Sequence, residues 1–82
     1  MTTQKLSNIP LRDFRKFLES QGLKLIKTSK GRGGHEKWTR FDLERPITIQ
    51  THVDPVPEFI VLQILRYLSM NRRQFFEVLD NL

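Results

Sequence analysis

The sequence predicts an α+β fold: a three-stranded antiparallel sheet with helices packed on one face, in the order α-β-β-β-α plus a short C-terminal helix. Two patterns predict it. Apolar residues recur at helical spacing near both ends of the chain, and the middle segments alternate between apolar and polar residues. At 82 residues, the chain is expected to form one domain spanning 1–82.

The first helix is expected at about 10–21. Pro10 suits a first helical turn, and Gly22 is a typical stop after a last one. Between them, apolar side chains repeat at helical spacing: Leu11, Phe14, Phe17 and Leu18. The following segment, 23–28, is expected to be a strand.

Two alternating segments, 36–41 and 46–53, predict the second and third strands, and the short link 42–45 predicts a hairpin between them. Burial of the large aromatic Trp38 favours a register in which it lies opposite Ile49. That register has a second consequence: His35 would lie opposite His52, so both imidazoles would share one end of a polar face.

Pro55 and Pro57 open a second helix that is apolar nearly all round and is therefore expected to form the centre of the core. Its apolar residues are Phe59, Ile60, Val61, Leu62, Ile64, Leu65 and Leu68. Asn71 is a favourable N-cap for a last helix from Arg72 to about Asp80.

The composition bounds the class of partner. The net charge of +5 favours nucleic acid, an acidic protein or an anionic surface. No apolar stretch approaches the length of a membrane span, so no membrane is expected. The absence of Cys excludes disulfides and fits a reducing compartment, and the N-terminus shows no signal-peptide pattern. We therefore expect a cytoplasmic protein.

The cations concentrate in the middle of the chain, around a glycine-rich loop. Six of them lie within 17 residues: Lys24, Lys27, Lys30, Arg32, Lys37 and Arg40. Glycines such as Gly33 and Gly34 let backbone N–H groups turn toward an anion, while Lys30 and Arg32 supply charge. The chain has two His residues but no Cys and no well-spaced carboxylates, so no metal site is expected, and no cofactor motif is present.

His35 is the candidate catalytic residue. An imidazole is the usual proton carrier at neutral pH, and RNA supplies its own nucleophile, the 2′-OH. One His flanked by Lys37, Arg32 and Lys30 is sufficient for such chemistry, with the cations stabilising the transition state. Three alternatives stay open: a surface His at a strand end, a non-catalytic RNA-binding module, and a domain whose basic face docks an acidic protein.

The segment Gly34-His35-Glu36-Lys37-Trp38, followed by an Ile-rich strand ending in Thr51-His52 and an apolar helix, resembles the HicA family of bacterial toxins. The resemblance covers about residues 10–80. It extends to the ending Phe75-Phe76-Glu77-Val78-Leu79, which is similar to the family's usual tail.

The resemblance implies a fold like the double-stranded-RNA-binding domain and a toxin of a toxin–antitoxin system that acts in stress. It implies metal-independent cleavage of mRNA and neutralisation by a HicB antitoxin that covers the catalytic His, which corresponds to His35. Gly34 stands where the family has Ser. The residues expected to contact RNA are Lys30, Arg32, Gly33, Gly34, Lys37 and His52.

Overall fold

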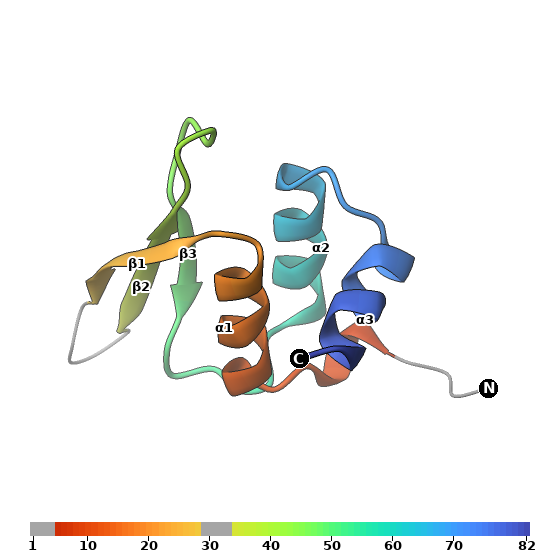
Figure 1. The fold of residues 1–82 in the computed structure, drawn as a ribbon. Coiled ribbons are helices and arrows are strands. Elements are labelled where there is room, and N and C mark those ends of the chain that lie inside the picture. Colours follow the sequence, from red (N-terminus) through yellow and green to blue (C-terminus); the bar gives the residue numbers. More distant parts are fainter. Residues whose placement is uncertain (1–4, 29–33) are drawn as a thin grey trace.

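A computed structural model describes residues 5–28 and 34–82, in which three α-helices lie beside a three-stranded antiparallel sheet (Figure 1). The strands are ordered β1-β2-β3 across the sheet. The elements are a short 3₁₀ turn η1 (Leu6–Asn8), α1 (Leu11–Ser20), β1 (Lys24–Thr28), β2 (His35–Thr39), β3 (Ile47–Gln50), α2 (Glu58–Tyr67) and α3 (Arg72–Asp80). The expected α+β class and antiparallel sheet are confirmed.

Helices α1 and α3 are held together by an aromatic cluster. Phe14 and Phe17 of α1 and Phe75 of α3 are fully buried, and the rings of Phe17 and Phe75 meet edge to face with centroids 4.7 Å apart. In Figure 1, α1 and α2 lie between the sheet and α3. The expected cap of α3 is confirmed, because Asn71 and Gln74 form a reciprocal capping box.

The start of α1 receives its cap from a distant part of the chain. The Leu11 N–H donates to Asp54 Oδ1 over 2.9 Å, which places a carboxylate at the helix N-terminus, where the helix dipole favours negative charge. The next segment is tied to the same place, since the Val56 N–H donates to the Ile9 carbonyl over 2.9 Å. The helix ends before Gly22, whose φ of +82° lies in the left-handed region.

The two faces of the sheet differ as the alternation predicts. Trp38, Ile47 and Ile49 are buried against the helices, whereas Thr48 and Gln50 on the opposite face are exposed. The hairpin register, however, differs from the predicted one by two residues: Trp38 lies opposite Ile47 and not Ile49. An even shift returns every side chain to the same face, so burial alone does not distinguish the two registers.

The reason for the shift lies in the β2–β3 loop, which runs from 40 to 46 and is longer than expected. The Arg40 guanidinium bonds both oxygens of Asp42, at 2.6 and 3.1 Å, and also donates to the Gln21 carbonyl. The Tyr67 hydroxyl accepts from the Arg45 N–H and donates to the Arg45 carbonyl, joining the loop to α2. These contacts close a wider turn, whose Phe41 side chain is 99% exposed.

The Arg40–Asp42 contact leads to a prediction about pH. The hydrogen bond from the Arg40 guanidinium lowers the pKa of Asp42 below its ordinary value. The contact therefore stabilises the loop when Asp42 is ionised, and its contribution is lost as the pH falls through that lowered pKa. An NMR titration of the Asp42 carboxyl should show a lower midpoint in the wild type than in Arg40→Gln. Equal midpoints would show that the contact does not form in solution.

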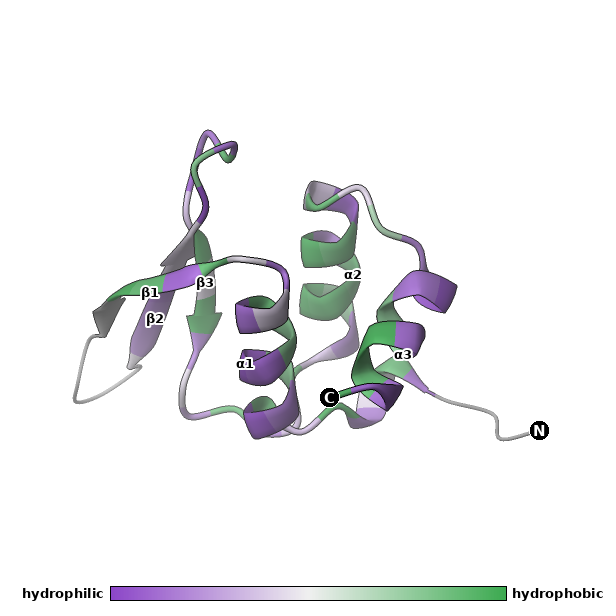
Figure 2. Cartoon of the chain, in the orientation of Figure 1, coloured by the Kyte–Doolittle hydropathy of each residue, from purple (hydrophilic) through white to green (hydrophobic). Residues whose placement is uncertain are grey.

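Helix α2 has one buried side, not an apolar surface that is covered all round. Val61, Ile64 and Leu65 are buried, but Phe59 is 69% exposed. At 100° per residue, Phe59 points well away from the direction of the buried three, so it lies outside the core. In Figure 2, α2 is nonetheless the most continuously hydrophobic helix. Within residues 5–28 and 34–82, no helix has the length and apolar character needed to cross a bilayer.

Candidate active site

His35 is the first residue of β2, and its cross-strand partner is Gln50, the last residue of β3. The Thr51 N–H donates to the Gly34 carbonyl over 2.9 Å, so Gly34 and Thr51 form a hydrogen-bonded pair. The next pair, His35 and Gln50, then occupies the alternate position, where cross-strand side chains approach most closely. The result is a half-buried imidazole beside an exposed side-chain amide.

The predicted pairing of His35 with His52 is wrong. Strand β3 ends at Gln50, and His52 lies exposed in the turn that follows. The two-residue shift of register that moves Trp38 also moves the partner of His35 from His52 to Gln50. Of the two histidines, only His35 therefore lies within the paired part of the hairpin.

A pocket of about 310 Å³ opens beside His35, between the end of β3 and the start of α2. The hairpin contributes polar side chains to it, those of His35, Thr48 and Gln50. Ile49 of β3 also lines the pocket, and the opposite wall is apolar and is formed by Val53, Val56, Pro57, Phe59 and Ile60. This wall is anchored, because the bonds from Leu11 to Asp54 and from Val56 to Ile9 hold the segment before α2 against the start of α1.

Lys37 is the described cation on the same strand face as His35. It lies two residues further along β2, so its Cα is roughly 7 Å from that of His35. Its side chain is exposed. Gly34 is buried, and its carbonyl accepts a hydrogen bond from the Thr51 N–H. The other predicted RNA-contacting residues of the loop, Lys30, Arg32 and Gly33, lie outside the described residues.

A buried ion pair supports β2 on the side opposite to His35. Glu36 is only 6% exposed and is bound at both oxygens by Arg15 of α1: Arg15 Nε donates to Oε1 over 3.0 Å, and Nη2 lies 2.9 Å from Oε2. The Trp38 indole N–H also donates to Oε1, over 3.3 Å. This cluster joins α1 to β2 one residue from His35, so it fixes the strand that carries the imidazole.

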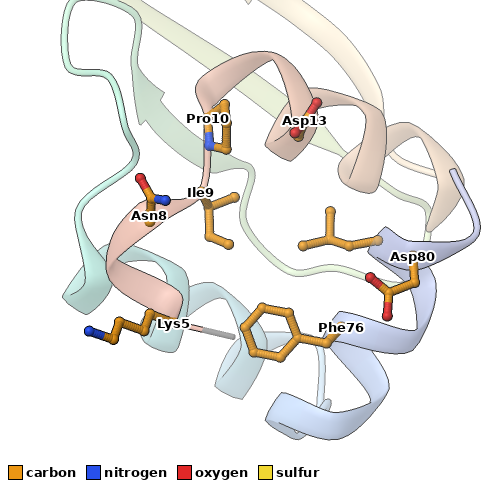
Figure 3. Close-up of a pocket in the computed structure, with 8 residues that line it drawn as sticks. Lys5, Asn8, Ile9, Pro10, Asp13, Phe76 and Asp80 are labelled. Atoms are coloured by element: carbon orange, nitrogen blue, oxygen red, sulfur yellow. The ribbon is translucent and has the colours of Figure 1, made fainter. Parts of the chain in front are cut away.

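Other cavities suit this chemistry less well. The cavity in Figure 3, of about 400 Å³ between the 3₁₀ turn and α3, is lined by Asp13 and Asp80 with Lys5 as its cation. Two carboxylates disfavour a phosphate there. Within residues 5–28 and 34–82, no three His, Cys, Asp or Glu side chains are grouped closely enough to hold a metal ion.

Comparison of the chain with protein-family models, with curated proteins and with solved structures finds no match. The site therefore has to be interpreted from its own geometry. Sequence reasoning identified His35 and Lys37 as candidates, and the structure places both on the exposed side of β2.

Sequence reasoning missed Gln50 and Phe59. Gln50 could have been found only from the correct hairpin register, which depends on the length of the β2–β3 loop. The signal for Phe59 was its angular position on α2 relative to Val61, Ile64 and Leu65. Both residues line the pocket beside His35.

Proposed function

We propose that this protein is a metal-independent endoribonuclease that cleaves mRNA, with His35 as general acid or base. The observation that carries the proposal is a half-buried imidazole that opens into a pocket, next to exposed Lys37 and opposite exposed Gln50. Such a His combines access to substrate with a fixed position on a strand. The net charge of +5 favours an anionic substrate.

The reaction needs few groups. An imidazole removes the proton of a 2′-OH, whose oxygen attacks the adjacent phosphorus. The bond from phosphorus to the 5′-oxygen breaks, and that oxygen takes up a proton from the imidazolium, which returns to its neutral form; the products are a 2′,3′-cyclic phosphate and a 5′-OH. Lys37 stabilises the negative charge that develops on the phosphate oxygens.

The resemblance to the HicA family extends this proposal to a biological role. The protein would act as the toxin of a toxin–antitoxin module in the cytoplasm, with mRNA as substrate and a HicB-like antitoxin as partner. The α-β-β-β-α order supports a fold like the double-stranded-RNA-binding domain. An alternative function is a non-catalytic RNA-binding module that uses the same exposed face for phosphate contacts and shape recognition.

Purified protein incubated with single-stranded RNA in EDTA tests the proposal. We expect RNA fragments ending in a cyclic phosphate, and no cleavage of the matched DNA, which lacks the 2′-OH. Binding should weaken steeply as salt rises, because phosphate contacts release counterions.

The outcomes separate the candidate functions. RNA binding without cleavage would support the non-catalytic module and contradict the nuclease. Absence of both binding and cleavage would contradict both and favour a surface for a protein partner. Cleavage only in the presence of a divalent metal would contradict the proposed chemistry.

A further inference from the structure

Phe59 and Gln50 stand on two sides of the His35 pocket and have no role in the proton transfer described above. Phe59 belongs to the first turn of α2, and Gln50 ends β3. Both side chains are exposed, Phe59 at 69%. The ring and the amide both line the pocket beside the candidate catalytic imidazole, where they are accessible to a bound ligand.

An aromatic ring in this place suits a nucleobase. Proteins that recognise single-stranded RNA stack splayed bases on aromatic side chains and bind the base edges with polar groups. A pocket of about 310 Å³ is at the small end of ligand sites and fits one flat ring better than a peptide segment. Val53 and Pro57 complete an apolar surround for such a ring.

Gln50 then selects the base. Its side-chain amide has one acceptor and two donors, which match the adjacent N7 acceptor and N6 amino group on the Hoogsteen edge of adenine, a two-point contact that no other base offers on that edge. The hairpin places the Gln50 side chain beside that of His35, because the two residues pair at the closely spaced position. A base that contacts Gln50 therefore lies beside the imidazole.

We propose that this pocket binds an adenine base next to the scissile phosphodiester, with Phe59 as stacking surface and Gln50 as the residue that reads the base. The inference rests on the proposed function for the meaning of "scissile", but base binding can be measured without cleavage. Phe59 sets affinity for all bases, because every base has a π-face. Gln50 sets the difference between bases.

Fluorescence anisotropy tests this with labelled oligouridine that carries a single central A, C, G or U, using His35→Ala protein to prevent cleavage. We expect the oligonucleotide with the central A to bind roughly 5- to 150-fold more tightly than the one with U, the range of one two-point contact. Gln50→Glu removes the amide N–H that donates to the ring nitrogen of adenine, so the preference for A over U should be lost.

The role of Phe59 has a matched control within the chain. Phe59→Ala should weaken binding of all four oligonucleotides by roughly 5- to 150-fold, and Phe59→Trp should restore it. Phe41→Ala removes an even more exposed ring, 99% against 69%, from the β2–β3 loop, away from the pocket, and should leave binding unchanged. The Trp rescue separates stacking from a loss of helix stability.

The outcomes distinguish this inference from the proposed function. Equal binding of all four oligonucleotides, or equal effects of Phe59→Ala and Phe41→Ala, would overturn the base pocket. If wild-type protein still cleaves RNA under those conditions, the nuclease proposal stands without it. If base preference and the Phe59 effect are found but no cleavage occurs, the pocket stands and the nuclease proposal fails.

Discussion

Replacing Arg15 by Met is expected to lower the free energy of unfolding by about 2–4 kcal/mol, somewhat less than the 3–5 kcal/mol typical of breaking a fully buried ion pair. The variant leaves the Glu36 carboxylate buried, with the Trp38 indole N–H as its one remaining hydrogen-bond partner among the described residues. The expected loss in the free energy of unfolding is smaller because the Arg15 side chain is 37% exposed and water screens the pair from that side.

Replacing the other partner of the ion pair, Glu36, should lower the free energy of unfolding by less. In Glu36→Gln, the amide oxygen still accepts from Trp38 and from Arg15, and the Arg15 guanidinium can turn toward water. We expect a loss of about 1–2 kcal/mol. Urea unfolding followed by Trp fluorescence measures both variants, and the signal is specific because Trp38 is the only Trp in the chain.

Arg12→Met is the matched control. Arg12 lies on the same helix and pairs with Asp13 at 3.7 Å, but its side chain is 82% exposed. We expect a change within about 0.5 kcal/mol, as is usual for surface pairs. If Arg15→Met and Arg12→Met unfold alike, the Arg15–Glu36 pair does not support the fold in solution.

Replacing His35 by Ala is expected to reduce kcat for RNA cleavage by about 10²- to 10⁴-fold, the contribution of a positioned general acid or base. The unfolding midpoint should change little, because His35 is only half-buried and points away from the core. Single-turnover kinetics with saturating protein measure the chemical step directly.

His52→Ala removes the other imidazole of the chain from the turn beyond β3. Since His52 does not lie opposite His35, we expect kcat to stay close to the wild-type value, with any loss confined to RNA affinity. Equal loss of kcat in the two variants would contradict the assignment of His35. Full cleavage by the His35→Ala protein would do the same.

The elements that sequence predicts well are those set by local chemistry. Asn71 and Gln74 of α3 cap their own helix, so the start of that helix follows from four adjacent residues. The faces of β2 and β3 follow from alternation, because Trp38 and Ile49 must be buried. Neither result depends on contacts between distant segments.

The register and the pocket depend on tertiary contacts and were missed for that reason. Alternation fixes only whether a shift is even or odd, while the contacts of Arg40 and Arg45 in the loop decide its size. The partner of Glu36 is equally remote in sequence, since Arg15 lies 21 residues earlier. His35 was identified without these contacts because its chemistry is intrinsic to the residue type.

Adjacent residues of strand β2 have two different roles. Residue 35 faces the pocket, and residue 36 forms the buried ion pair with Arg15 of α1. If the protein acts as the proposed toxin, substitutions at both positions would survive a genetic selection for loss of toxicity, but for separate reasons. Changes at 35 would leave normal amounts of inactive protein, whereas most changes at 36 would lower the steady-state amount of protein. Measuring protein abundance among the survivors would therefore map the two faces of this strand.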